Sequence, residues 1–312
     1  MVHRQIRSPS GIDASLPVSA GGSGKVREGP FISIITSTRN AALQLPKAIR
    51  AMRSQNYCNF EWVMIDGAST DGTVDLIRKN SDIINSWVSE TDGGIYEAWN
   101  KGLRLARGEW LCFLGADDWL WDSNVLSKLS TVLIEAYPTF RIVYGKVAIV
   151  NQGGEILLYE GAPWGEVRRR FRSIMCIPHP GLMYHRSVFE EHGGFDPSFR
   201  IAGDYELLLR ELRHREALFA PDVVTAGMSI DGISSRAESI GVSLQESWRA
   251  ARKHGRLFPG LPWMTSMSRH AVRRTLWSLL GEEKARDALD LGRRMIGKPP
   301  YWSKYYPRNS DL

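Results

Sequence analysis

From residue 31 to about residue 118, short apolar runs alternate with segments that carry apolar residues at every third or fourth position. The apolar runs have the length of strands, and the periodic segments indicate helices with one buried face. The predicted strands are 31–36, 61–65, 86–89 and 110–114, and the predicted helices are 43–52, 74–79 and 95–107. This alternation with short connections predicts an α/β fold, with a mostly parallel central sheet flanked by helices.

The alternation weakens past Asp118, and the remaining elements are less regular. The predicted elements are a helix at 125–136, a strand at 141–144, a hairpin at 148–159, a helix headed by Asp204, a strand at 218–228 and helical segments at 242–253 and 265–291. A basic run at 168–172 is placed near a loop, and 232–236 is read as a loop.

The chain divides into three parts by composition. Residues 1–29 are rich in Ser and Gly without periodicity, which predicts a flexible N-terminal extension. Residues 30–236 contain the alternating elements and are predicted to form one domain. Residues 237–312 are predicted to form a basic helical C-terminal extension.

Polar side chains follow three of the predicted strands where each strand ends. These clusters are Thr36–Asn40, Asp66–Asp71 and Asp117–Asp118. A parallel sheet brings the carboxyl ends of its strands to one edge, where open α/β sheets bind ligands. The sequence therefore predicts a ligand site at this edge.

The adjacent carboxylates Asp117 and Asp118 offer hard oxygen ligands for Mg²⁺ or Mn²⁺. An Asp-rich turn or helix N-cap is the alternative for this pair taken alone, but it does not explain three polar clusters at one edge. The cysteines Cys58, Cys112 and Cys176 share no metal-ligand spacing, so we expect no zinc site and a reducing compartment.

The net charge of +6 is concentrated in the tail. Residues 245–312 hold fourteen Lys and Arg against six Asp and Glu, so the rest of the chain is slightly acidic. This distribution argues against a nucleic-acid partner. Aromatic residues and Arg273 and Arg274 interleave in the tail, which fits either peripheral contact with a membrane surface or a helical cap with a solvated basic face.

Neither a membrane-spanning run nor a secretory h-region is expected from the hydropathy pattern. We therefore expect a cytoplasmic protein, with peripheral binding to the inner face of the membrane as the further hypothesis. The P-loop pattern GxxxxGK[ST] is absent, and no GxGxxG follows the first strand, which excludes the common ATPase and dinucleotide fingerprints.

Four segments in order resemble the motifs of family 2 glycosyltransferases, which are inverting enzymes with the GT-A fold that often act in bacterial surface polysaccharide synthesis. The segments are Phe31–Asn40, Val63–Thr73, Asp92–Gly102 and Leu114–Asp118. The resemblance covers about residues 31–235 and implies a GT-A domain over 30–236. It also implies a nucleoside-diphosphate sugar donor, expected to be UDP-linked, and a glycan or lipid-linked acceptor.

The resemblance implies a role for each matching residue on the nucleotide side. Thr36 and Arg39 would border the base, and Asp66 would hydrogen-bond it. Asp92 and Lys101 would line the nucleotide pocket.

On the diphosphate side, Asp117 and Asp118 would occupy the metal motif and hold Mn²⁺ or Mg²⁺, with Asp117 also able to serve the ribose. This chain has Gly115 where many family members carry a further Asp, which leaves the division of labour between the two carboxylates open.

Asp204 occupies the place of the family's catalytic base, although the Glu that usually precedes this Asp is replaced by Gly203. The alternative is a helix N-cap, a role that Asp fills without any catalysis. His179, between two prolines, matches a histidine on the acceptor or diphosphate side in the family, and a structural loop histidine is its alternative.

The sequence therefore predicts an inverting, metal-dependent hexosyltransferase that acts in polysaccharide synthesis. The alternatives are a sugar-phosphate nucleotidyltransferase, although the Gly-rich loop typical of that class is missing after the first strand, and a non-catalytic relative that binds nucleotide-sugars.

Overall fold

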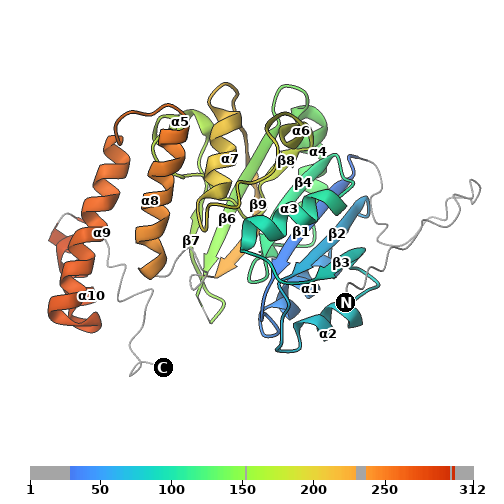
Figure 1. Cartoon of the computed structure of the whole chain (residues 1–312), viewed down its shortest axis with the longest axis horizontal. Coiled ribbons are helices and arrows are strands. Elements are labelled where there is room, and N and C mark those ends of the chain that lie inside the picture. Colours follow the sequence, from blue (N-terminus) through green and yellow to red (C-terminus); the bar gives the residue numbers. More distant parts are fainter. Residues whose placement is uncertain (1–28, 152, 230–236, 296, 299–312) are drawn as a thin grey trace, which may run out of the picture.

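Four neighbouring strands form the parallel half of the sheet in the computed structural model, which describes residues 29–151, 153–229, 237–295 and 297–298 (Figure 1). The elements of this half are β1 (Ile32–Thr38), α1 (Leu45–Arg53), β2 (Phe60–Asp66), α2 (Thr73–Lys79), β3 (Ser86–Ser89), α3 (Ile95–Leu105) and β4 (Trp110–Gly115). The strands lie in the order β3-β2-β1-β4, and every neighbouring pair is parallel. The predicted strand–helix alternation is confirmed here.

The second half of the chain makes the sheet mixed. Its elements are β5 (Trp119–Leu120), α4 (Val125–Ala136), β6 (Ile142–Val150), β7 (Ile156–Glu160), α5 (Trp164–Phe171), β8 (Met183–His185), α6 (Ser187–His192), α7 (Gly203–Leu212) and β9 (Leu218–Ser229). Within the described residues the order continues from β4 through β8, β6 and β9 to β5, while β7 pairs with β6. The strand β8 runs antiparallel to both β4 and β6, whereas β6 and β9 are parallel.

One local prediction for this half was wrong. The predicted strand at 141–144 and the first strand of the hairpin form one strand, β6, which continues through Gly145 because a Cβ atom there would clash with the Val223 carbonyl oxygen of β9. The basic run at 168–172 forms the last turn of α5 and the residue after it, and Trp164 and Phe171 anchor that helix to the core. The short strands β5 and β8 had no recognisable pattern.

The sheet is covered on both faces, so its strands are apolar on both sides. One cluster packs alternate strand residues such as Ile35 and Phe113 against α3, α5, α6 and α7. The other packs Ile34 and Cys112 against α1, α2 and α4.

Three helices follow β9: α8 (Ala237–Lys253), α9 (Leu261–Leu280) and α10 (Glu282–Met295). They lie beside α7, at the end of the molecule opposite β3 (Figure 1). The single helical segment expected at 265–291 is divided at Gly281, whose φ of +74° is a left-handed conformation that ends a helix. Among the described residues, none of the helices has the length and hydropathy needed to cross a membrane.

The expected N-terminal extension up to residue 28, the loop at 232–236 and the last part of the tail lie outside the described residues.

Candidate active site

The ends of β1, β2 and β4 meet at one edge of the sheet, as the sequence predicts. Thr38 lies opposite Asp66 in the β1–β2 register, and Ser37 lies opposite Gly115 in the β1–β4 register. The Gly67 amide donates to the Thr38 carbonyl at 2.8 Å, which continues the pairing one residue past the end of β2. The three polar clusters are therefore neighbours in space.

Asp66 is fully buried and held in one orientation by hydrogen bonds from Ser69 and Ser89. Its Oδ2 accepts from the Ser69 amide at 2.9 Å and from the Ser89 hydroxyl at 2.6 Å, and its Oδ1 accepts from the Ser69 hydroxyl. The Ser69 oxygen in turn accepts from the Asn40 amide at 2.7 Å. These bonds tie the loop after β1 to the loop after β2 and fix the Asp66 carboxylate between them.

Both loops contain a non-glycine residue in the left-handed region. Asn40 has a φ of +50° and Ala68 has a φ of +56°. Such strain is retained where the surrounding contacts over-determine the backbone, and it is common at ligand sites.

Arg39 and Asp92 approach each other across Gly67. A Cβ atom on Gly67 would lie 2.9 Å from Asp92 Oδ2 and 3.4 Å from Arg39 Cδ, so a side chain there would displace one of them. The structure thus brings Arg39, Asp66 and Asp92 together around the end of β2.

Lys101 supports this group from behind. Its ammonium group lies 3.0 Å from Glu90 Oε1 and donates to the Thr91 carbonyl at 2.9 Å, and its side chain is only 12% exposed. Lys101 therefore holds the loop that carries Asp92.

The two threonines of β1 differ in what they offer. The Thr36 hydroxyl accepts from Trp62 Nε1 at 2.9 Å inside the core, so the side chain of Thr36 faces away from the edge. The Thr38 hydroxyl is also buried, but it has no hydrogen-bond partner within the described part of the chain. A buried hydroxyl without a partner is costly, so the last position of β1 has an unmet hydrogen bond. Sequence reasoning missed Thr38, although its place at the last position of β1 was the available signal.

Asp117 and Asp118 converge over Gly115. A Cβ atom on Gly115 would lie 2.8 Å from Asp117 Oδ1 and 3.2 Å from Asp118 Oδ2, so the missing side chain makes room for both carboxylates. Asp118 Oδ2 accepts from the Gly115 amide at 2.9 Å. Burial, and then the charge of the neighbouring Asp117, raise the pKa of Asp118 to about 8.

This donor set fits a divalent cation. Two carboxylates that crowd each other in a poorly hydrated position are unfavourable alone and favourable around a positive ion. The described residues contain no cluster of three or more His, Cys, Asp or Glu side chains that could hold a metal ion. Asp117 and Asp118 would therefore hold Mg²⁺ or Mn²⁺ only with phosphate oxygens and water as further ligands, which is the usual way Mg²⁺ binds.

Asp204 lies in the first turn of α7, facing the helix α3. Its Oδ1 accepts from the Tyr205 amide at 2.8 Å and from the Tyr96 hydroxyl at 3.1 Å. A Cβ atom on Gly203 would lie 2.8 Å from ring carbons of Tyr96, so only glycine lets the start of α7 approach this ring. Gly203 thus explains why no Glu precedes the Asp in this chain. Sequence reasoning missed Tyr96, which it placed only on the helix 95–107.

His179 lies within electrostatic reach of Asp204 and is held by aromatic contacts. Its ring stacks on Trp99 with 5.0 Å between centroids, and its Nε2 lies 3.0 Å from the Tyr184 hydroxyl. Burial lowers the pKa of His179, and the nearby charge of Asp204 opposes this shift only in part. His179 is therefore neutral at pH 7.

Asp118 and Asp204 each lie close enough to affect a residue of two paired strands, β4 and β8. Burial and then the charge of Asp118 raise the pKa of Cys112 in β4 to about 12, and burial and then Asp204 raise that of Tyr184 in β8 well above its usual value. Cys112 pairs with Met183, the residue before Tyr184. The contact with Tyr96 places Asp204 beside the first turn of α3, the helix that follows Asp92.

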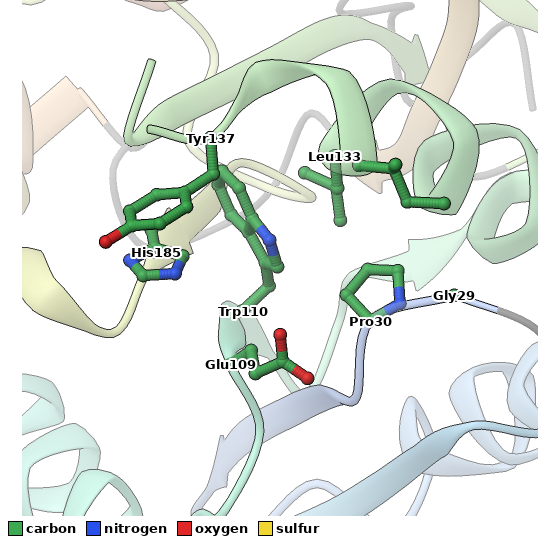
Figure 2. A pocket seen from close by; sticks show the side chains of 8 residues that line it. Gly29, Pro30, Glu109, Trp110, Leu133, Tyr137 and His185 are labelled. Atoms are coloured by element: carbon green, nitrogen blue, oxygen red, sulfur yellow. The ribbon is translucent and has the colours of Figure 1, made fainter. Parts of the chain in front are cut away.

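A pocket of about 300 Å³ lies at the other edge of the sheet (Figure 2). Pro30, Glu109, Trp110 and His185 line it, at the amino ends of β1 and β4. The predicted site residues are not among those that line this pocket.

Comparison with known proteins agrees with this geometry. The family model described as glycosyl transferase family 2 matches residues 33–193. A PGL/p-HBAD biosynthesis glycosyltransferase of Mycobacterium bovis (strain BCG / Pasteur 1173P2) is 32% identical over 188 residues, which cover 58% of this chain and 69% of the relative.

Two solved structures share the fold at low sequence identity. TarS of S. aureus (residues 1–349), in complex with UDP-GlcNAc, aligns with a TM-score of 0.55 and 15% identity over 84% of this chain and 77% of its own. The mannosyltransferase PcManGT of Pyrobaculum calidifontis, in complex with GDP-Man and Mn²⁺, aligns with a TM-score of 0.56 and 20% identity over 89% and 84%. With a family model that matches more than half of its length and a GT-A sheet that carries the motifs at one edge, the chain belongs to glycosyltransferase family 2.

Proposed function

We propose that this glycosyltransferase is an inverting enzyme that moves a hexose from a nucleoside-diphosphate sugar, with UDP as the expected nucleotide, to a hydroxyl group of a glycan or lipid-linked acceptor in polysaccharide synthesis. The observation that carries the proposal is that Asp204 contacts Tyr96 in the first turn of α3, the helix that follows Asp92, at the edge where the strand ends bring Asp66 and the Asp117–Asp118 pair together. The nucleotide-sugars in the complexes of TarS and PcManGT support the donor class, and the Mn²⁺ of PcManGT supports the metal.

The proposed nucleotide pocket is built around Asp66. Its carboxylate would accept a hydrogen bond from the base, because the surrounding serines already fix its orientation. Arg39 and Asp92 would border the base and ribose on either side of Gly67, and the unpartnered Thr38 hydroxyl would bind a polar atom of the same ligand. Thr36 and Lys101 would act indirectly, through the core and through the Asp92 loop.

The chemical step would be a direct displacement at the anomeric carbon. The oxygen of the acceptor hydroxyl would attack the anomeric carbon while Asp204 accepts the proton of that hydroxyl, and the bond to the nucleoside diphosphate would break. Tyr96 would hold the Asp204 carboxylate toward the acceptor hydroxyl. His179, neutral and stacked on Trp99, would donate or accept a hydrogen bond at the acceptor or diphosphate. A cation on Asp117 and Asp118 would neutralise the charge that develops on the leaving diphosphate.

A screen of ligands by thermal shift tests the donor class. UDP, GDP, UDP-GlcNAc and GDP-Man are each added with and without Mn²⁺, and release of nucleoside diphosphate is followed in parallel. We expect a uridine nucleotide with Mn²⁺ to raise Tm most. A ligand at a hundred times its Kd raises the free energy of unfolding by about 2.7 kcal/mol, so the shift is measurable.

The ligand screen has clear contradicting outcomes. A guanine nucleotide with the largest shift would contradict the UDP assignment. Binding without any release of nucleoside diphosphate would favour the non-catalytic alternative.

The C-terminal helices are also the proposed site of contact with membranes. The residues proposed for this contact differ from the aromatic residues named in the sequence hypothesis. Trp263 Nε1 donates to the Leu244 carbonyl at 2.7 Å, and its ring lies 6.0 Å from that of Trp248, so these aromatics join α9 to α8. Among the exposed apolar residues of this region, Leu257 and Phe258 at the α8–α9 turn are 83% and 79% exposed.

The helix α9 supports a lipid surface as the partner of this turn. It contains Arg269, Arg273 and Arg274 and no acidic residue, and none of its residues is buried. Basic helices with exposed apolar residues bind anionic interfaces by this combination.

Replacing both Leu257 and Phe258 by Asp is expected to reduce binding to phosphatidylglycerol vesicles at least 10-fold. Each buried apolar side chain contributes about 1.5–3 kcal/mol, and the new carboxylates would be repelled by the lipid. Co-sedimentation measures the loss, with Ile134→Asp on α4 as the matched exposed control. Equal binding of the double variant and the wild type would contradict this role of the turn.

A further inference from the structure

One face of α8 holds the segment that leads into α7. Polar side chains at the spacing i, i+3, i+7 and i+8 share one face of a helix. Three of the four residues on this face of α8 lie within the helix, and the fourth directly follows its last residue. The residues are Glu246, Arg249, Lys253 and His254. All four contact the stretch from Asp196 to Glu206, in which Asp204 lies.

Glu246 makes the most specific of these contacts. Its Oε1 accepts from the Arg200 amide at 2.8 Å, and its Oε2 accepts from the Ile201 and Ala202 amides at 2.8 and 2.9 Å. The Glu246 side chain is only 13% exposed, so water has little access to these three donors. The three amides belong to the residues that lead into α7, the last of them its N-cap residue Ala202.

The other residues on this face fix α8 in place. Arg249 donates to the Ser198 carbonyl at 2.8 Å, and Lys253 bridges Asp196 at 2.8 Å and the fully buried Glu206 at 3.0 Å. Although burial opposes it, hydrogen bonds from His254, Arg210 and Lys253 lower the pKa of Glu206 to about 2. Glu206, two positions beyond Asp204, therefore keeps its negative charge and binds Lys253 of α8 and His254, the residue after that helix.

The Glu246 contact is linked to Asp204 through Ile201 and the Tyr96 hydroxyl. Ile201, whose amide Glu246 binds, accepts a hydrogen bond from the Tyr96 hydroxyl through its carbonyl. The same hydroxyl lies 3.1 Å from Asp204 Oδ1. The position of the 200–202 backbone therefore sets both where Tyr96 points and where α7 begins.

We propose that Glu246 is a positioning residue for Asp204: by binding the amides of residues 200–202, it holds the carboxylate of the proposed base against Tyr96. The inference rests on the proposed function in taking Asp204 as the base, whereas the contact itself does not. A segment outside the matched family region, which ends at residue 193, thereby becomes part of the active site.

The test uses Glu246→Gln in the full chain, with Glu246→Ala as a stronger second variant. Gln keeps the shape and can still accept from Ile201 and Ala202, but its amide group opposes the Arg200 amide. Glu216→Gln is the matched control, because Glu216 makes only an exposed ion pair with Arg168 among the contacts described for it. Hydrogen exchange of the 200–202 amides and steady-state release of UDP from UDP-GlcNAc with Mn²⁺ are measured for each.

We expect exchange of the 200–202 amides to accelerate at least 10-fold in Glu246→Gln and further in Glu246→Ala. We also expect kcat to fall about 10-fold and 100-fold, with KM for UDP-GlcNAc within 2-fold of wild type. A purely structural role would change kcat and KM together with Tm. Unchanged exchange, or an unchanged kcat beside faster exchange, would overturn the proposal.

If the wild type releases no UDP from UDP-GlcNAc and no GDP from GDP-Man, the result contradicts the proposed function and leaves the Glu246 contact untouched. The exchange measurement then decides alone whether Glu246 holds this segment, and NMR titration of the Asp204 carboxyl in Glu246→Gln decides the positioning. An Asp204 titration identical to wild type would overturn it.

Discussion

Asp204→Asn is expected to lower the rate of sugar transfer about 1000-fold, within the range that general base catalysis contributes. The amide has the same shape as the carboxylate, and its oxygen can still accept from the Tyr205 amide and the Tyr96 hydroxyl. It cannot take a proton from an acceptor hydroxyl. The measurement is kcat for release of nucleoside diphosphate in the presence of acceptor.

Donor binding should survive this change, because Asp66, Asp92 and the Asp117–Asp118 pair are untouched. Isothermal titration with UDP and Mn²⁺ should give a Kd within about 2-fold of wild type. Asp222→Asn, an exposed residue of β9, is the matched control for the substitution itself. Full activity of Asp204→Asn would remove Asp204 as the base and leave the helix N-terminal role as its explanation.

Asp118→Asn is expected to abolish Mn²⁺-dependent stabilisation and to lower transfer at least 100-fold. Asn can accept from the Gly115 amide in the same way, so the local fold should persist. One carboxylate remains for the cation, and charge neutralisation of the leaving diphosphate would be lost. Thermal shift with Mn²⁺ and UDP measures the binding, and Asp75→Asn on the surface of α2 serves as control.

The pH dependence of this site has a definite sign. Since the pKa of Asp118 is raised to about 8 by burial and then by Asp117, a proton and the cation compete for the same carboxyl group at pH 7. The affinity of the wild type for Mn²⁺ should therefore rise from pH 6 to about pH 8 and level off above it. Without metal, a raised pKa means that the folded state loses stability as the pH rises from about 4 to about 8, and Asp118→Asn should lack this loss. A Tm that is equally pH-dependent in both proteins without metal would contradict this account.

The parallel half of the fold was predictable because each of its strands and helices has its own local sequence pattern. Each strand from β1 to β4 is a short apolar run bounded by polar residues, and the burial of β4 on both faces follows from its sequence alone. Past Asp118 the information is no longer local. The strand β8 is three residues long and exists because β4 and β6 offer it partners on both sides.

The candidate site shows the same division. The strand-end rule brought the clusters Thr36–Asn40, Asp66–Asp71 and Asp117–Asp118 to one edge, because it depends only on strand direction. It could not separate Thr36 from Thr38, since that requires knowing which hydroxyl Trp62 already satisfies. Nor could it find Tyr96 or Glu246, whose partners are 108 and 44 to 46 residues away along the chain.

The face of α8 formed by Glu246, Arg249, Lys253 and His254 has a consequence for recombining this protein with its relatives. A chimaera joined after residue 236 would inherit the complete donor pocket and lose the partners of Glu206 and of the 200–202 amides on that face. Swapping C-terminal regions should therefore preserve activity only when the junction falls beyond His254. Such a junction would transfer the α9–α10 surface and leave the contacts of α8 with residues 196–206 intact.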